Sequence, residues 1–187
     1  MDRRQQKTRA AIFEAFYALL EKKSYSSITV QEIIDTANVG RSTFYAHFET
    51  RDALLKEICT DLFEHVISSH ARSESTHDFS ESDLNADSIV THILYHLRDS
   101  RGTITGLLGD GSCETFTRYF RQYLGILFRR EWGSQLENRD IAADFLLNHM
   151  TATFVEMVRW WVQDGMKEPP EQMERYFAEL TGPILHS

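Results

Sequence analysis

Apolar residues recur at intervals of three and four along almost the whole 187-residue chain. This spacing places them on one face of an α-helix, and no convincing strand alternation or hairpin turn interrupts it. The pattern therefore predicts an all-α protein of about nine helices. The clearest helical stretches cover residues 4–23, 30–37, 41–48, 50–70, 87–101, 112–132, 140–164 and 170–186.

Length and composition indicate a globular protein of one or two domains. The chain is 42% hydrophobic and long enough to bury roughly 70% of its extended surface. Its two cysteines, Cys59 and Cys113, form no C-x-x-C pair, so free thiols in a reducing compartment are expected. The longest uncharged stretch, residues 145–155, is too short to cross a bilayer, and the basic N-terminus lacks an apolar signal-peptide core. We therefore expect a cytoplasmic protein.

Charge is unevenly distributed along this chain, whose formal net charge is −8. Residues 1–56 hold nine Lys and Arg against seven Asp and Glu, a net charge of +2, and the remainder carries −10. Such asymmetry directs one end of a protein toward a polyanion. The alternative is that a net charge of +2 is close to neutral and has no functional meaning.

Two short helices joined by a three-residue turn give residues 29–48 the layout of a helix-turn-helix. Thr29 and Glu32 make a capping box, in which each side chain bonds an otherwise unpaired backbone N–H at the start of the first helix. A connection of sequence Asn-Val-Gly then leads directly into the second helix. The small, uncharged outer face of that helix is suited to entering a DNA major groove.

The second of these helices, residues 41–48, has two different sides. Phe44 and Phe48 lie four residues apart and face a core. The outward residues are Ser42, Thr43, Tyr45 and Ala46. Arg51, in the first turn of the next helix, is a candidate phosphate contact because helix N-termini favour anions. The alternative is a short connector helix with ordinary surface groups.

The stretch TVQEIIDTANVGRSTFYAHFETRDALL resembles the DNA-binding signature of TetR-type (TetR/AcrR) transcriptional regulators, and the resemblance covers about residues 8–58. It implies phosphate or base contacts from Thr29, Thr43, Tyr45, His47 and Arg51, and candidate base readers at Gln31, Arg41 and Ser42. Three positions depart from the family pattern. Asn38 stands where Gly is usual, Gly40 takes the usual Ser or Thr cap position, and Ala46 replaces a frequent bulky or basic residue. Asn tolerates the left-handed backbone angles expected at the first of these positions.

The resemblance also implies two functional parts. A helix-turn-helix DNA-binding domain is expected at residues 1–50, and an effector-binding and dimerisation domain at residues 51–187. The helix 51–70 connects the two, and the polar, serine-rich segment 72–83 is expected to be a mobile loop. In regulators of this type the last two helices pair across a two-fold axis.

The helix predicted at residues 140–164 is apolar on more than one side. A helix with several apolar faces is buried on several faces, so dimerisation is the simplest explanation, and a two-fold dimer suits a palindromic DNA site. The alternative is the central helix of a monomeric bundle. The candidate interface residues are Phe154, Met157, Trp160, Trp161 and Phe177.

Polar groups accompany an aromatic stripe on the helices after residue 84. A mostly apolar cavity with a few polar groups is what a small-molecule site requires. The candidate pocket residues are Tyr95, His96, Phe116, Tyr119, Phe120, Tyr123, His149 and Thr153. The alternative is that most of this stripe is ordinary core.

Catalytic and metal-binding signatures are not found in the sequence. It has no nucleophile elbow, phosphate-binding glycine loop or paired-carboxylate signature, so we expect neither an enzyme nor a cofactor. His92 and His96 are spaced to share a metal, but no third ligand is identifiable. Cys113 is interpreted as a buried thiol, the alternative being an oxidant sensor.

Together these features predict a dimeric, ligand-responsive transcriptional regulator, most often a repressor in families of this kind. It is expected to bind double-stranded DNA at a palindromic operator and to be released by an unidentified small molecule. Ligand binding is expected to shift the connecting helix 51–70 and so the spacing of the two DNA-reading helices. The alternative is a protein-interaction module or coactivator on the same fold, with an acidic body that binds a partner protein and with reduced DNA reading.

Overall fold

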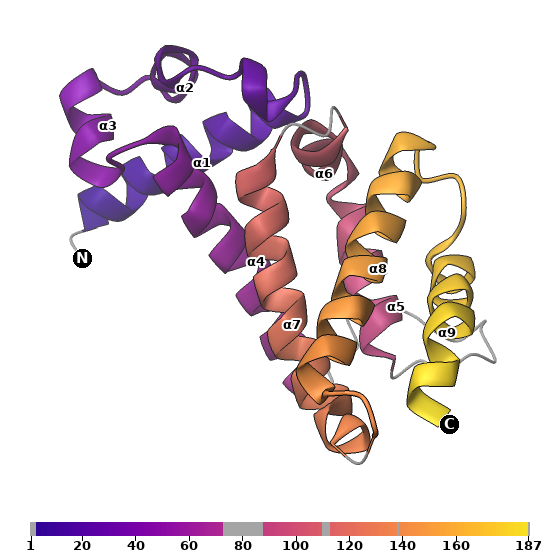
Figure 1. Cartoon of the computed structure of the whole chain (residues 1–187). Helices are drawn as coiled ribbons and strands as arrows, with labels where there is room; N and C mark the ends of the chain where they lie inside the picture. The colour runs from indigo at the N-terminus through magenta and orange to yellow at the C-terminus, as the bar shows by residue number, and fades with distance from the viewer. Residues whose placement is uncertain (1–2, 73–87, 110–112, 138, 187) are drawn as a thin grey trace.

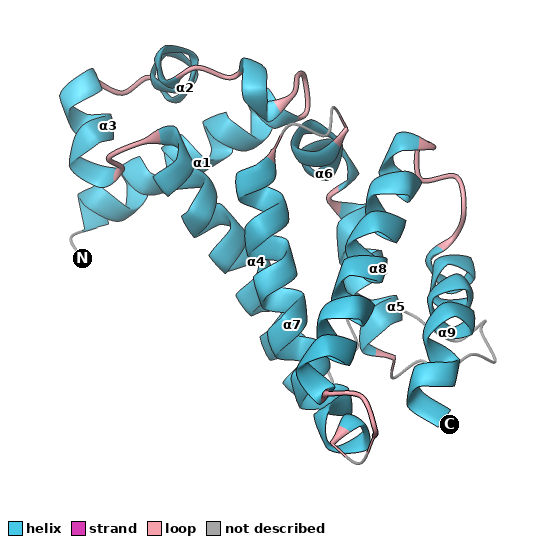
Figure 2. Ribbon diagram, viewed as in Figure 1, coloured by secondary structure: helices cyan, strands magenta, loops and turns pink. Residues whose placement is uncertain are grey.

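The computed structural model of the chain describes residues 3–72, 88–109, 113–137 and 139–186. Within these ranges the chain is helical and has no β-strand, which confirms the all-α prediction (Figure 2). The elements are α1 Arg3–Leu20, the 3₁₀ turn η1 Tyr25–Ser27, α2 Val30–Ala37, α3 Arg41–His47, α4 Arg51–Arg72, α5 Ile89–Asp99, α6 Arg101–Leu108, α7 Glu114–Leu136, α8 Ala143–Gln163 and α9 Pro170–His186. Apart from Arg72, the segment predicted as a mobile loop, residues 72–83, lies outside the described residues.

Helices α1, α2 and α3 form a small unit at one end of the molecule (Figure 1). Its centre is the apolar stripe of α1, because Ile12, Phe16 and Leu20 are each at most 1% exposed. α1 packs along α2, and Phe44 and Phe48 from the α3 segment belong to the same buried cluster. The sequence pattern and the packing therefore agree on which side of α3 faces the core.

The long helix α4 leaves this unit and runs into the C-terminal half of the molecule (Figure 1). There it packs against α7 and α5. Its buried side chains from Leu54 to Phe63 belong to one hydrophobic core that extends through both halves. A movement of α4 therefore displaces core side chains in both halves of the molecule.

The C-terminal half is a helical bundle. α7 and α8 are joined by a short loop and form the most extensive helix pair, while α9 packs on α5 and α8. α6 is short and lies between α1 and the bundle, where it contacts α5, α7 and α8 as well. The bundle therefore touches the N-terminal unit at a place separate from α4.

The helix α6, Arg101–Leu108, is the main element that the sequence pattern does not predict. Its segment contains Gly102 and Gly106 together with β-branched residues, all of which have low helix propensity. Burial overrides that preference, because Ile104 and Leu107 are at most 1% exposed. α7 also continues to Leu136, four residues beyond its predicted end at 132.

The end of α8 is a turn that lies between the helices predicted at residues 140–164 and 170–186. Gly165 has φ +75°, the left-handed conformation that glycine adopts at low cost after a helix. The Met166 N–H donates to the Trp161 carbonyl at 2.7 Å, and the Trp161 indole donates to the Glu168 carbonyl at 2.8 Å. α9 then begins at Pro170, a residue favoured in the first helical turn.

Three residues predicted at a dimer interface lie in the core of the single chain. Phe154 and Trp161 are fully buried, and Phe177 is 2% exposed. The Phe154 and Phe177 rings meet edge to face at 5.3 Å, and the Phe128 ring packs against both, at 5.7 Å from each. This corrects their prediction as dimer-interface residues. α7 and α9 cover two apolar sides of α8, so a second chain is not needed to explain them.

Candidate nucleic-acid interface

Backbone hydrogen bonds close the turn between α2 and α3. Asn38 has φ 51° and ψ 47°, in the left-handed region, and its N–H bonds the carbonyls of Asp35 and Ile34. The Val39 N–H donates to the Ile34 carbonyl at 3.1 Å. Asn is one of the few residues besides glycine that adopt this conformation at low cost, as expected at this position. Gly40 then caps α3 with an extended backbone and no side-chain bond.

Aromatic packing anchors α3 to α1. Phe44 is fully buried, and the Phe48 ring lies 5.9 Å from the Phe13 ring of α1. The Arg9 guanidinium lies over the Phe13 and Phe48 rings, 5.0 and 5.5 Å from their centroids. Arg9 also forms an ion pair with Glu57 of α4. The inner side of α3 therefore packs on α1, and Arg9 ties the same part of α1 to α4.

The outer side of α3 is exposed. Tyr45 is 47% exposed, and its ring meets the buried Phe44 ring edge to face at 5.4 Å. Its exposed neighbours are Ser42 and Ala46, and its half-buried neighbours are Thr43 and His47. α3 carries no acidic residue. This surface thus presents hydroxyl, phenol and imidazole groups on a rigid support.

A chain of hydrogen bonds joins the start of α3 to α2. Arg41 Nη2 donates to Gln31 Oε1 at 2.6 Å, and Gln31 Nε2 donates to Asp35 Oδ1 at 2.8 Å. The structure therefore brings together two predicted base readers, Arg41 and Gln31. Asp35 was not among the predicted site residues, although its spacing of four residues from Gln31 on one helix is a sequence signal for such a contact.

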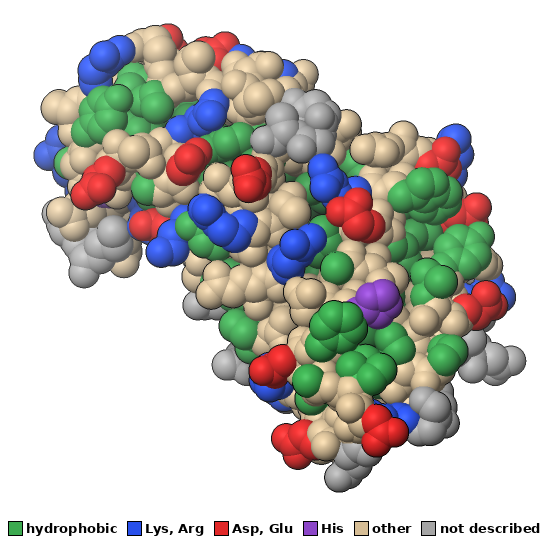
Figure 3. Space-filling model, in the orientation of Figure 1, with side chains coloured by type: hydrophobic (Ala, Val, Ile, Leu, Met, Phe, Trp, Pro, Cys, Tyr) green, Lys and Arg blue, Asp and Glu red, His purple; other side chains and the backbone are tan. Residues whose placement is uncertain are grey.

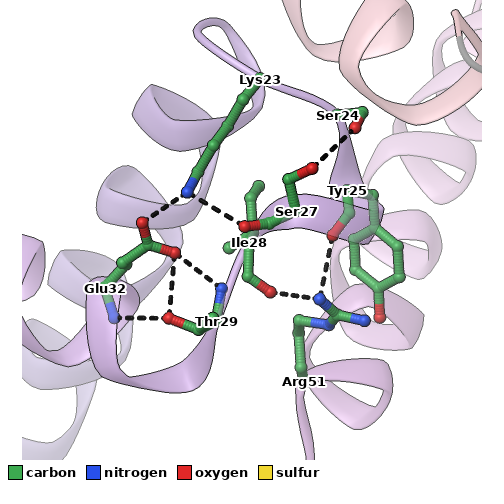
Figure 4. Close-up of polar contacts among 8 residues, drawn as sticks. All are labelled: Lys23, Ser24, Tyr25, Ser27, Ile28, Thr29, Glu32 and Arg51. Atoms are coloured by element: carbon green, nitrogen blue, oxygen red, sulfur yellow. Dashed lines mark hydrogen bonds and ion pairs between the residues drawn. The ribbon is translucent and has the colours of Figure 1, made fainter.

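Thr29 occupies the N-cap of α2 (Figure 4). Its Oγ1 accepts from the Glu32 N–H at 3.2 Å, and the Glu32 carboxylate accepts from the Thr29 N–H at 2.9 Å, which confirms the predicted capping box. The Lys23 ammonium binds the same carboxylate and donates to the Ser27 carbonyl at 3.1 Å. The network ties the end of the α1 segment to the start of α2.

The capping network lowers the pKa of Glu32 from 4.5 to about 2. The first cause is the hydrogen bond from Lys23, followed by those from the Thr29 backbone and hydroxyl. Each of these bonds favours the ionised carboxylate. The carboxylate that holds the cap is therefore charged throughout the physiological pH range.

Arg51 points toward the η1 turn (Figure 4). Its Nη1 donates to the carbonyls of Tyr25, at 3.0 Å, and Ile28, and its guanidinium lies 4.1 Å from the centroid of the Tyr25 ring. The Tyr25 hydroxyl donates to Asp52, and burial, followed by this bond, raises the pKa of Tyr25. Arg51, predicted as a phosphate contact, thus also fastens the turn before α2 to the start of α4. No local pattern signals this contact, since its partners are 26 and 23 positions away.

A second candidate site is an apolar cavity among α4, α5 and α7. Its volume is about 10 Å³, room for no more than about one water molecule. Its lining consists of Phe63, Ile93, His96, Leu97, Phe120, Tyr123, Leu124 and Leu127. Three predicted pocket residues, His96, Phe120 and Tyr123, therefore meet here. Phe116, another predicted residue, stacks on Phe120 at 5.6 Å.

The other predicted pocket residues do not line this cavity, which corrects the prediction of a single pocket. Tyr95 donates its hydroxyl to Glu171 of α9, and Tyr119 is half-buried at the edge of the core. His149 is exposed on α8, and Thr153 lines a groove between α8 and α9. Helical spacing identifies a face of each helix, but only packing decides which faces meet.

The groove between α8 and α9 is open and apolar, with a volume of about 790 Å³. It is lined by Thr153, Glu156, Met157, Trp160, Tyr176, Glu179 and Leu180. Trp160 is 50% exposed and Leu180 62% exposed. Two predicted interface residues, Met157 and Trp160, lie here, and hydrophobic side chains are visible over α8 and α9 (Figure 3).

Within the described residues, no group of three or more His, Cys, Asp or Glu is arranged to hold a metal ion. The Nε2 atoms of His92 and His96 lie 3.1 Å apart. Cys59 and Cys113 are both buried, as interpreted for Cys113 from the sequence, and burial raises the pKa of the Cys59 thiol. In the same part of the chain, no helix is both long and apolar enough to span a bilayer.

Comparison with known proteins identifies the family. Residues 12–58 match the family described as bacterial regulatory proteins of the tetR family, and residues 84–182 match a transcriptional regulator C-terminal region of the same group. The chain belongs to the TetR family. The first match covers the helix-turn-helix described above, and the second covers most of the bundle. This TetR-family protein is a DNA-binding transcriptional regulator and not an enzyme.

Individual relatives agree with this family membership. The crystal structure of a TetR transcriptional regulator from Streptococcus agalactiae is 36% identical, covers 96% of each chain and has a TM-score of 0.71. RolR, solved in complex with resorcinol, shares the fold at 19% identity, covering 99% of this chain and 90% of that chain with a TM-score of 0.64. An uncharacterised regulator of Bacillus subtilis, YxbF, is 23% identical over 96% of this chain. The chain spans 46% of the length of YxbF and about a third of the other curated relatives it matches.

The Glu32 network leads to a prediction for acid stability. The pKa of Glu32 is lowered in the folded state, so its stabilising contribution is complete above about pH 4.5 and is lost as the pH falls through about 2. Glu32→Gln removes the charge. We expect the variant to be less stable than the parent at neutral pH and to lose less stability across this acid range, as measured by urea unfolding followed by circular dichroism.

The matched control is Glu131→Gln, which alters an exposed glutamate of α7. It should retain the pH dependence of the parent. Equal acid sensitivity of the parent and Glu32→Gln would contradict the assignment of the lowered pKa to the capping network.

Proposed function

We propose that this protein is a dimeric, effector-responsive regulator, a repressor, that binds a palindromic operator and is released by a small molecule. The observation that carries the proposal is the exposed outer side of α3, which is held by Phe44 and Phe48 and bears no acid. In a two-fold dimer, two such helices read half-sites about one helical turn of DNA apart. Because chromosomal DNA is the target, the proposed place of action is the cytoplasm.

The proposed DNA contacts fall into two groups. Arg41, Ser42 and Gln31 lie at the start of α3 and on α2, where helix-turn-helix proteins contact base edges. The other group contacts phosphates or bases, and it comprises Thr29, Thr43, Tyr45, His47 and Arg51. Arg51 acts partly through the η1 turn, because its guanidinium holds the Tyr25 and Ile28 carbonyls.

The proposed dimer interface is the groove between α8 and α9. Trp160 and Leu180 are large apolar side chains with at least half of their surface exposed. Burying them in a two-fold contact removes apolar surface from water, which is the main favourable term in association. Met157 belongs to this interface, whereas Phe154, Trp161 and Phe177 support it from the core.

The proposed effector site is the cavity among α4, α5 and α7. No charged side chain is among its described lining residues, its wall is apolar, and the Tyr123 hydroxyl already donates to Thr60 Oγ1 at 3.1 Å. An uncharged, mainly apolar effector fits this chemistry. RolR, a protein of the same fold, has been solved with resorcinol bound.

Effector binding is proposed to move α4 through Phe63. This α4 residue stacks on Phe120 at 5.4 Å and packs on Tyr123 at 4.9 Å. The cavity is too small for an aromatic ring, so a ring can enter only if these side chains separate. The displaced α4 then changes the spacing of the two α3 helices.

The test of this function is sequence-selective DNA binding by the purified protein to the fragment directly upstream of its own gene. Arg41→Ala should cost about 1 to 3 kcal/mol in operator binding, and Tyr45→Ala, which removes an uncharged contact, should weaken binding while leaving the slope of log affinity against log salt unchanged. Fluorescence anisotropy across a salt series measures both. Arg130→Ala, an exposed arginine of α7, is the matched control and should bind like the parent. A parent protein with no preference for this fragment over unrelated DNA would refute the proposal.

The dimer interface is tested by a charge placed in the groove. Trp160→Glu and Leu180→Glu each put a carboxylate where an apolar surface is to be desolvated, so each should convert the dimer to monomers in sedimentation velocity experiments. Ile126→Glu is the control, because Ile126 is 55% exposed on α7 and does not line the groove. Dimers that persist in both groove variants would exclude this interface.

The effector class is tested with three probes of similar size at millimolar concentration: phenol, benzoate and benzylammonium. Phenol should raise the melting temperature, because ligand bound to the folded state stabilises it, and the two charged probes should not. Leu124→Phe adds bulk to the cavity lining and should abolish the shift measured relative to its own melting temperature. A shift of equal size with a charged probe would overturn the assignment.

A further inference from the structure

A backbone contact between α1 and α6 joins the two halves of the protein separately from α4. A methyl group placed on Gly106 of α6 would lie 2.2 Å from the carbonyl oxygen of Leu20, the last residue of α1, and 2.9 Å from its carbonyl carbon. A Cβ atom does not fit at these distances, so the two helices approach backbone to backbone. Beside this contact, a methyl group on Gly102 would lie 2.9 Å from Cγ of Glu21.

Close approach explains why position 106 is a glycine. Among the described glycines, only Gly165 has a positive φ, so the backbone conformation of Gly106 is open to any residue. Glycine inside a helix is also less favourable than alanine. The neighbouring Leu20 carbonyl is therefore the feature that excludes a side chain here.

α6 is also held firmly on the side of the bundle. It contacts α5, α7 and α8, and Ile104 is fully buried. Only Ser100 separates α6 from α5. α5 in turn lines the proposed effector cavity through Ile93, His96 and Leu97. Because a single residue separates the two helices, a displacement of α5 also displaces α6.

From this arrangement we infer that Gly106 is a positioning residue, whose contact with the Leu20 backbone sets the orientation of the DNA-binding unit. Effector binding reaches that unit along α5, α6 and α1, in addition to the route through α4. The inference rests on the proposed function for its biological meaning. The contact itself is a property of the fold and can be tested without DNA.

The first experiment compares Gly106→Ala with Gly125→Ala. Gly125 is in α7, and a methyl group there meets nothing within 4 Å, so alanine should raise the melting temperature by about 2 to 4 °C. Gly106→Ala should instead lower the melting temperature and weaken binding to the upstream fragment by at least about fivefold, the lower end of usual coupling between sites. Gly125→Ala should bind the fragment like the parent.

A second measurement reports orientation without DNA. Spin labels are attached at Ala46→Cys of α3 and Glu131→Cys of α7, two exposed positions, in chains diluted with unlabelled protein. The native Cys59 and Cys113 are at most 2% exposed, so labels go to the new sites. Gly106→Ala should shift or broaden the distance distribution from pulsed electron paramagnetic resonance. Gly125→Ala should leave it unchanged.

A second pair of variants, Gly102→Ala with and without Glu21→Ala, tests the inference if Gly106→Ala does not fold. Gly102→Ala crowds only the Glu21 side chain, so it should give a smaller change in the same distance. The double variant Gly102→Ala/Glu21→Ala lacks the crowded Cγ and should restore the distance distribution of the parent. An unchanged distance in Gly102→Ala and Gly106→Ala, or a change that Glu21→Ala does not reverse, overturns the inference. If the parent protein does not bind the DNA fragment selectively but these distances change as expected, only the proposed function is refuted.

Discussion

Burial of Phe44 and Phe48 against α1 is the interaction on which the proposed DNA-binding surface depends. α3 has only seven residues, too few to be a stable helix by itself in water. Its conformation is maintained because the two rings enter the core shared with Ile12 and Phe16. The same packing directs Ser42 and the neighbouring small side chains outward. Fold stability and the exposure of the reading surface thus come from one set of contacts.

Three basic residues of the N-terminal unit stabilise its structure through contacts within the protein. Lys23 holds the α2 cap, Arg51 holds the η1 turn, and Arg9 pairs with Glu57 while covering two phenylalanine rings. These three side chains contribute to the modest +2 of residues 1–56, yet all are engaged within the protein. These three residues therefore stabilise the N-terminal unit in addition to contributing to its net charge.

Much of the fold follows from patterns that act over a few residues. Helical spacing, the Thr29–Glu32 capping box, the left-handed Asn38 and the Gly165 turn were all predictable, because each depends on backbone bonds within about one helical turn. α6 was missed since its glycines oppose a helix and only burial between α1 and the bundle stabilises it. Three residues predicted at the dimer interface, Phe154, Trp161 and Phe177, are instead covered by the chain itself.

The sequence by itself determined that this chain is all-helical, that it carries a helix-turn-helix, and that Phe44 and Phe48 define the inner side of its second helix. Only the tertiary structure decided that Arg51 turns toward Tyr25, that His96 and Tyr123 share a cavity from which His149 is absent, and that Gly106 touches α1. The physical reason is the separation in sequence between the residues that make each contact. Caps and helical faces are set by near neighbours, whereas each of these contacts joins residues far apart in sequence and depends on how whole helices pack.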